Sequence, residues 1–446
     1  MILNEAAWNR DVAIEREGGL RRVREKSGDD ESWAAVGMGG DRYGDPFDSR
    51  FAIEIAQDLD GVEKDWARLE DDGLLTPFQM RAWLFPFYRE LAPRLKAKPL
   101  FVLARDRADG APMMLLPLCA RRIYGVNVVQ FADLGVSDYN APILAKAFDP
   151  TPAQWRRLWR RILAGLGLGG VLRFKNMPRR IAGRSNPLTL DRSFSAPMEI
   201  ASWGVELPTT AAAYRAQFLS RKFAKDIAKK TRRAARAGEV EFVPARTPGD
   251  RRLAFDLLAR QRQERCDEMG RGNSLASPAY RRFYEAVAVE SEAGLARLFL
   301  LKVGGEALGA MLALERGAAF HVIMATFEGG AWKSCSLGNV LTLAAIEHCI
   351  REGFAFYDLT IGNEGYKKRF GAAPAQLHCA LRPLTPADAP LASALAFAFA
   401  ARGFLGRWIG WIKRGPPRRG SQAEADSLRD VPACAPQLRA EQGQRS

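Results

Sequence analysis

The stretch Ser334–Phe370, SCSLGNVLTLAAIEHCIREGFAFYDLTIGNEGYKKRF, decides the fold that this sequence predicts. Its first half predicts a helix, because Ser336 is a suitable N-cap, Gly353 is a suitable terminator and apolar residues recur between them at helical spacing. These apolar positions are Val340, Leu343, Ile346 and Ile350. The aromatic and apolar run Phe354–Thr360 then predicts a buried strand that ends at Gly362. A loop, a helix, a strand and a short basic helix are therefore expected in that order.

The start of this helix is a candidate seat for an anionic cofactor. Free backbone N–H groups and the helix dipole both favour a phosphate group at such a position. The residues concerned are Ser336, Leu337, Gly338 and Asn339. An ordinary helix–strand unit of a protein core would give the same pattern, and the stretch alone leaves both interpretations open.

The whole chain has 446 residues, which is enough for two or three domains with buried cores. No uninterrupted apolar run reaches the ~18 residues of a membrane span. The six cysteines include no C-x-x-C pair and the three histidines are scattered, so we expect no metal site and a reduced, cytoplasmic setting. The net charge of +15 predicts attraction to polyanions, without choosing among nucleic acid, anionic lipid and phosphorylated substrates.

One order of elements occurs twice in the chain. Three strands, a loop, a helix and a strand are expected over residues 99–175 and again over residues 297–360. The two copies are barely alike in sequence, so chance agreement of two α/β stretches is the alternative. The pattern predicts one domain over residues 49–205 and a second over 206–385, after a disordered segment 1–48 that lacks the apolar core of a signal peptide.

A strongly basic segment, residues 214–236, lies between the copies. It holds nine Lys or Arg residues against the single acidic residue Asp226, with Phe218 and Ile227 as sparse apolar anchors. A helix that binds a polyanion is one interpretation. A solvated connecting helix, whose long basic side chains cover apolar surface, is the other.

The C-terminal part of the chain changes character. Residues 386–413 are apolar, with two internal arginines and with Trp408 and Trp411 near the end. This composition suits an amphipathic helix in the interface of an anionic membrane, and it equally suits a terminal helix packed on its own domain. Residues 414–446 are expected to form a disordered tail.

The end of the opening stretch carries a recognisable pattern, D-x-x-x-G-x-E-x-Y-K-x-x-F. Its residues are Asp358, Gly362, Glu364, Tyr366, Lys367 and Phe370. With the three strands, loop, helix and strand before it, the pattern resembles the GNAT superfamily of N-acyltransferases. More narrowly it resembles CelD/BcsL-type acyltransferases, which are linked by name to bacterial cellulose synthesis, and their Fem-type relatives, which carry two GNAT units in tandem. The resemblance covers about residues 51–385.

The resemblance implies an α/β (α+β) fold of tandem GNAT-like domains. Each domain would have a mixed, mostly antiparallel sheet flanked by helices, with the basic helix connecting them. The donor would be acetyl-CoA or a longer acyl-CoA, its pantetheine arm lying between the splayed strands 319–325 and 354–360 and its pyrophosphate on the helix start at Gly338. The chain has Lys333-Ser-Cys-Ser-Leu-Gly at that loop, where most GNAT proteins have Arg/Gln-x-x-Gly-x-Gly/Ala.

Four residues of the pattern are candidates for catalysis: Lys367, Tyr366, Asp358 and Glu364. A carboxylate at the end of a strand facing a cleft can act as a base. Tyr366 would protonate the leaving thiolate, and the resemblance to Fem-type transferases implies that Lys367 stabilises the oxyanion. The alternatives are that Lys367 is a solvated helix residue and that Asp358 caps the following helix.

The acceptor side of the cleft is expected to involve the first unit. That unit begins its helix with Asp149-Pro-Thr-Pro, which disfavours a pyrophosphate, so we expect it to have lost the donor site. Asp138, Tyr139 and Asn140 are then candidate wall residues for the acceptor. His321, in the middle of a strand of the second unit, is expected to be a wall or core residue and is also a candidate for proton transfer.

The sequence thus favours an acyl-CoA-dependent N-acyltransferase, with O-acyl transfer as a variant. Its acceptor would be a sugar, an amino sugar or another precursor of cell-envelope polysaccharide in a bacterium. A Fem-like transferase that uses aminoacyl-tRNA is one alternative, and it is the only one in which the protein binds nucleic acid. A non-catalytic adaptor at an anionic membrane surface is the other. The expected location is cytoplasmic, with residues 390–413 as a peripheral contact to the inner face of the membrane.

Overall fold

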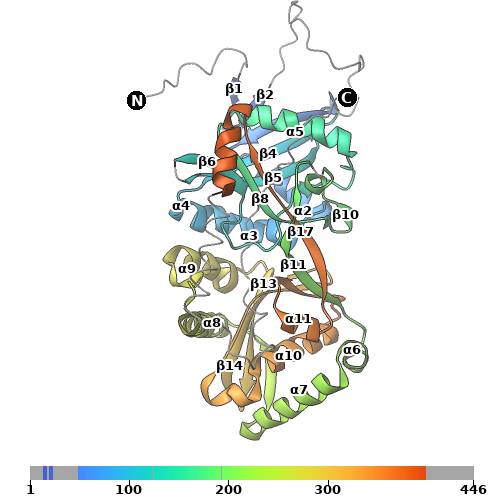
Figure 1. Ribbon diagram of the computed structural model, residues 1–446, viewed down its shortest axis with the longest axis vertical. Coiled ribbons are helices and arrows are strands. Elements are labelled where there is room, and N and C mark those ends of the chain that lie inside the picture. Colours follow the sequence, from blue (N-terminus) through green and yellow to red (C-terminus); the bar gives the residue numbers. More distant parts are fainter. Residues whose placement is uncertain (1–13, 18–19, 24–48, 124, 192, 398–446) are drawn as a thin grey trace, which may run out of the picture.

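The computed structural model describes residues 14–17, 20–23, 49–123, 125–191 and 193–397. It is an elongated α/β molecule whose two halves share one continuous mixed sheet of 15 strands (Figure 1). Fourteen strands lie side by side in the order β1-β2-β3-β4-β5-β6-β8-β17-β11-β16-β15-β14-β13-β12, and β7 pairs with β5. The expected α/β class, with a large mixed sheet flanked by helices, is confirmed.

The first unit is built on antiparallel strands followed by a helix and a parallel strand. Its strands are β3 (Phe51–Ala56), β4 (Lys98–Asp106), β5 (Pro112–Ile123), β6 (Val126–Phe131), β7 (Ile143–Leu144), β8 (Val171–Pro178), β9 (Arg180–Ile181) and β10 (Arg184–Ser185). Its helices are α2 (Glu63–Asp72), η1 (Pro77–Gln79), α3 (Arg81–Pro86), η2 (Phe87–Leu91), α4 (Ala92–Arg94), α5 (Pro152–Leu166) and η3 (Pro187–Thr189). Because successive strand residues face opposite sides, Phe101 packs into the core with Trp66 of α2. Its neighbour Val102 packs on the other face with Trp155 of α5.

The second unit repeats this arrangement. Its strands are β12 (Val240–Pro244), β13 (Ala296–Val303), β14 (Glu306–Arg316), β15 (Ala319–Phe327) and β16 (Phe356–Ile361). Its helices are α8 (Pro248–Met269), η5 (Ser274–Ala276), α9 (Pro278–Glu285), η6 (Ala286–Glu290), η7 (Gly330–Cys335), α10 (Leu337–Arg351) and α11 (Gly365–Arg369). Leu300 of β13 packs with Phe255 of α8 on one face, and Leu301 packs with Ile346 of α10 on the other. In both units the strand that follows the helix pairs in parallel with a strand that precedes the helix, β8 with β6 and β16 with β15.

The two units exchange their last strands. β11 (Ala196–Glu206) follows the first unit in sequence, but it pairs with β16 of the second. β17 (Ala373–Pro383) ends the second unit, but it pairs with β8 of the first. The two strands also pair with each other along the middle of the molecule (Figure 1). The domain boundary predicted at residue 205 therefore separates most of β11 from the unit whose sheet it completes.

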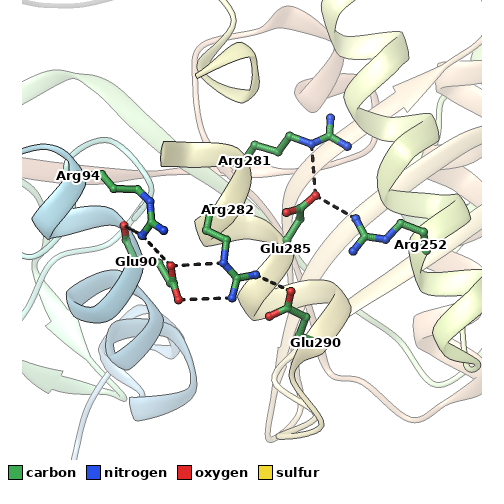
Figure 2. Close-up of polar contacts among 7 residues, drawn as sticks. All are labelled: Glu90, Arg94, Arg252, Arg281, Arg282, Glu285 and Glu290. Carbon is green, nitrogen blue, oxygen red and sulfur yellow. Dashed lines mark hydrogen bonds and ion pairs between the residues drawn. The ribbon is translucent and has the colours of Figure 1, made fainter. Parts of the chain in front are cut away.

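Helices also join the units beside the shared sheet. Figure 2 shows two groups of ion pairs, one of Arg94, Glu90, Arg282 and Glu290 and one of Arg252, Glu285 and Arg281. Arg282 of α9 contacts Glu90 of η2 at 3.3 Å and also pairs with Glu290 of η6. The ring of Trp83 also meets Phe283 edge-on, with 5.0 Å between centroids. Ion pairs and an aromatic contact thus both join the helices of one unit to those of the other.

Two local expectations need correction. The single basic helix predicted over residues 214–236 is interrupted, and α6 (Ala211–Phe218) ends before α7 (Arg221–Ala234) begins. The break occurs because Leu219 is extended and Ser220 caps α7 by accepting a hydrogen bond from the Phe223 amide. Within the segment 1–48, which was expected to be disordered, β1 (Ile14–Glu17) and β2 (Leu20–Val23) form a hairpin, and β2 satisfies the edge of β3.

The C-terminal prediction lies only partly within the described residues. After η8 (Pro386–Asp388) the chain is helical through residue 397, and Leu395 packs on Val128 and Val171 of the first unit's sheet. The packed alternative thus holds for these residues, whereas Trp408 and Trp411 lie outside the described part of the chain. Among the described helices, none combines the length and the apolar character needed to cross a membrane.

Candidate active site

The site lies where β15 and β16 separate. The two strands pair in parallel only from Ala319 to His321 on one side and from Phe356 to Asp358 on the other. Beyond that point β16 continues against β11, and no described strand pairs with the remainder of β15 on that side. The result is a splayed pair of strands with an open strand edge on β15, and His321 and Asp358 stand opposite each other at its vertex.

Asp358 is the centre of a buried hydrogen-bond cluster. Its carboxylate, 3% exposed, lies 2.8 Å from Nδ1 of His321 and accepts the Tyr139 hydroxyl at 2.8 and 2.9 Å. The amide of Thr360 donates a further hydrogen bond of 2.7 Å. Burial, followed by the charge of Asp358, raises the pKa of Tyr139 well above its usual value, so this hydroxyl stays protonated and donates. The cluster joins the loop 137–140 of the first unit to both splayed strands of the second.

Asp138 faces the same cluster from the first unit. Burial raises the pKa of this half-buried carboxyl to about 7, and the charge of Asp358 contributes in the same direction. A hydrogen bond from Thr360 and the charges of Lys367 and Lys175 act in the opposite direction. A carboxyl that titrates near neutrality and lies beside a histidine–aspartate pair is suited to acid–base chemistry.

Lys367 has a different environment from the one that the pattern alone suggests. Lys367 as a whole residue is 2% exposed. Its ammonium donates to the carbonyls of Thr360 (3.3 Å), Ile361 (2.8 Å) and Gly362 (3.5 Å). It also pairs with Glu364 at 3.0 Å. Thr360 has a left-handed φ of 54°, which is strained for a β-branched residue, and it lies two positions after Asp358. Lys367 therefore holds the strained end of β16 next to the carboxylate.

The structure brings together some of the predicted site residues and separates others. Asp358, His321, Tyr139 and Asp138 form one cluster, whereas Tyr366 is 41% exposed on α11. Asn140 is buried, and its side-chain amide donates to the Asp133 carboxylate at 2.6 Å. It therefore stabilises its own loop and does not contact the Asp358 carboxylate. His321 and Asp358 are both third in their strands as the structure has them, but in the predicted strands 319–325 and 354–360 they are third and fifth, so the sequence did not indicate this pair.

The predicted donor seat is an open helix start. Ser336 adopts a left-handed φ of 48° and its side chain does not cap α10, so the predicted capping by Ser336 is wrong. Gly338 is required at its position because an added Cβ would lie 2.5 Å from the ring of Phe327. Lys230 and Arg233 of α7 both donate to the carbonyl of Ser334, each at 3.2 Å, just before this helix start. The positive charge of α7 is thereby brought to the predicted phosphate position.

Comparison with known families agrees with this geometry. Residues 221–368 match a family model described as an acetyltransferase (GNAT) domain. The match makes this segment similar to GNAT acetyltransferase domains, and it covers less than half of the chain. It contains α7, the splayed strands β15 and β16 and the helix start at Gly338. No curated protein matches the sequence.

Solved structures with a similar overall arrangement are distant. FemX shares 10% identity, with coverage of 71% of this chain and 95% of that one and a TM-score of 0.48. The C-terminal domain of a protein assigned as a lysylphosphatidylglycerol synthetase from Agrobacterium fabrum shares 12% identity, covers 74% and 94%, and has a TM-score of 0.45. A tandem GNAT protein from the clavulanic acid biosynthesis pathway shares 13% identity, covers 75% and 99%, and has a TM-score of 0.40.

Proposed function

We propose that this protein is an N-acyltransferase that moves an acyl group from acyl-CoA to an amine. The observation that carries the proposal is the pairing of His321 with Asp358 at the vertex of the splayed strands, 2.8 Å apart. Transfer from a thioester needs a groove for an extended donor and a base beside the reacting carbonyl. The open edge of β15 offers the groove, since an extended pantetheine arm can hydrogen-bond to a free strand edge.

His321 is the general base of the proposed reaction. Asp358 accepts from Nδ1–H, which leaves Nε2 as the atom that can take a proton. The bound ammonium first loses one proton to solvent. The neutral amine attacks the thioester carbonyl, a C–N bond forms and the C–S bond breaks. The second proton of the amine goes to Nε2, and the leaving thiolate takes a proton from solvent to become the free thiol. Tyr139 holds the Asp358 carboxylate in place from the first unit.

Asp138 is proposed to bind the acceptor. As a carboxylate it attracts the ammonium form of an amine into the cleft beside His321. Its contribution from the first unit explains why the second unit alone does not complete the site. The acceptor class that we favour is an amino sugar or another cell-envelope precursor, because the sequence pattern resembles CelD/BcsL-type acyltransferases, which are linked by name to bacterial cellulose synthesis.

The donor is proposed to occupy the helix start at Gly338. The amides at the beginning of α10 would hold the pyrophosphate. Lys230 and Arg233, whose charged groups reach the adjacent Ser334 carbonyl, would supply the positive charge that the loop 333–338 carries only at Lys333. The same charged helix is the one observation that favours the second candidate, a transferase that uses aminoacyl-tRNA.

Native mass spectrometry of the full chain distinguishes the donors. The protein is mixed in parallel with acetyl-CoA, longer acyl-CoAs and aminoacyl-tRNA at one ionic strength. The proposal expects a one-to-one complex with an acyl-CoA, which Gly338→Asp weakens at least tenfold. A complex with aminoacyl-tRNA and none with acyl-CoA would replace this proposal by the second candidate.

A further inference from the structure

A cavity away from the Asp358 cluster lies where β17 completes the sheet of the first unit. It has a volume of about 700 Å³ and shares no lining residue with the Asp358 cluster. Its lining comes from α5, from the segment around Phe194, from Leu172 of β8 and from Arg382 at the end of β17. This volume is within the range of roughly 300–1,000 Å³ that is typical of small-molecule sites.

The lining of this cavity is strongly cationic. Its charged residues are Arg156, Arg157, Arg160, Arg382 and one acid, Asp191. The carboxylate of Asp191 already accepts from the amide and the hydroxyl of Ser193, at 2.8 and 2.7 Å, and lies 3.7 Å from Arg156. The one carboxylate of this lining is therefore largely engaged with its own loop and with Arg156.

Arg382 is the most informative of the four. It is half-buried, and burial lowers its pKa although the charge of Asp191 raises it. Its guanidinium donates to the carbonyls of Leu381 and Ser193 and forms no ion pair with a carboxylate in the described part of the chain. A cation removed from water is unfavourable unless an anion approaches it.

An aromatic surface lies next to these cations. The ring of Trp159 stacks on Trp155, with 5.6 Å between centroids and 28° between planes, and meets Phe194 edge-on at 5.2 Å. All three rings line the cavity and all are buried in the structure. The cavity lining thus combines aromatic rings with guanidinium groups. Guanidinium groups are well shaped to bind carboxylate or phosphate oxygens.

We propose that this cavity is a binding site for a small organic anion with an apolar body. A carboxylate or phosphate group would lie between Arg160 and Arg382, and the apolar body would rest on Trp159 and Phe194. The site is separate from the donor seat at Gly338. It gives the first unit, which lacks amides for a pyrophosphate at the start of α5, a ligand of its own.

A fluorescence titration of the full chain with 8-anilinonaphthalene-1-sulfonate tests the proposal, because this probe joins an aromatic body to an anionic group. We expect one saturable site, and at least tenfold weaker binding in both Arg160→Gln and Arg382→Gln. Arg68→Gln, an exposed arginine on α2, is the matched control and should bind like the parent. Arg160 lies on the exposed side of α5, so its variant should fold even if Arg382→Gln does not.

Two comparisons sharpen the result. The uncharged probe N-phenyl-1-naphthylamine should bind the parent at least tenfold more weakly. Displacement by octyl phosphate would assign a soluble anion, and displacement by phosphatidylglycerol vesicles would assign a lipid headgroup. Unchanged binding in Arg160→Gln or equal binding of the uncharged probe would each overturn the proposal.

Discussion

His321 and Asp358 face each other across a parallel strand pair, with 2.8 Å between Nδ1 and the carboxylate. This pair is the last in the ladder before β15 and β16 separate. A base and the group that orients it are therefore fixed by regular strand geometry, at the position where the proposed donor carbonyl would lie. Rigid elements position such groups better than loops do.

Asp138 makes the proposed reaction depend on pH near neutrality. Its carboxyl has a pKa of about 7, and the proposal needs it ionised to attract the acceptor. We expect kcat/KM to fall as pH decreases through about 7, and we expect Asp138→Asn to lower kcat/KM and to lose this limb of the profile. Initial rates from pH 5.5 to 9 measure both. An Asn variant with the parent's profile would remove Asp138 from the site.

The same carboxyl makes stability depend on pH. Its folded pKa of about 7 lies above the value of about 3.9 for an unfolded aspartate, so the folded state holds the proton more tightly. The stability of the parent should fall as pH rises from about 4 to about 7. Asp138→Asn lacks this titration. The melting temperature of the variant minus that of the parent should therefore increase between about pH 4 and pH 7 and stay constant at higher pH. Melting curves at closely spaced pH values provide the check, and a difference that is constant throughout would be inconsistent with this pKa.

Lys367 should act as a positioning residue. Lys367→Met leaves the carbonyls at the end of β16 without their donor, and each buried group without a partner costs about 1–3 kcal/mol. We expect a clearly lower melting temperature, whereas Lys368→Met on the same helix should resemble the parent. The sequence pattern alone predicts another result, a loss of turnover on the order of 10²–10³ from an oxyanion contact. Thermal melts and turnover at 25 °C separate the two roles, since a purely catalytic role would leave the melt unchanged.

Gly338 tests the donor seat. Gly338→Asp places a negative charge beside the proposed pyrophosphate, and we expect acyl-CoA binding to weaken at least tenfold, about 1.4 kcal/mol. Its side chain must also displace the ring of Phe327, so Gly338→Ala and Gly338→Ala with Phe327→Leu serve as controls for crowding. Calorimetric titration gives the affinities. Full affinity in the Asp variant would locate the donor elsewhere.

Local patterns predicted much of the second unit. The helical spacing and the glycine after it gave α10 to within a few residues, and Gly353 has the left-handed φ of 80° expected of a terminator. The pattern around Asp358 correctly indicated a GNAT domain. These features depend on residues close together in the chain, which is why they are readable.

Contacts between residues far apart in the sequence could not be predicted from such local patterns. Tyr139 and Asp358 are 219 positions apart, and their contact depends on how two units pack. The strand exchange was missed because β11 is not recognisable as a strand of the second unit until its partner β16 is known. Lys367 looks like an exposed helix residue beside Lys368, and only the turn of the chain at Thr360 makes it buried.

Release of free thiol from acyl-CoA tests the central claim most directly. The parent, His321→Gln and His378→Gln are compared with acetyl-CoA and the best acceptor from a panel of amino sugars. His378 lies on β17 outside the cluster and controls for the loss of an imidazole. We predict that His321→Gln loses turnover by a factor on the order of 10²–10⁴ while its affinity for acetyl-CoA stays close to that of the parent. Equal turnover of the parent and His321→Gln, or no thiol release by the parent with any acceptor, would contradict the account.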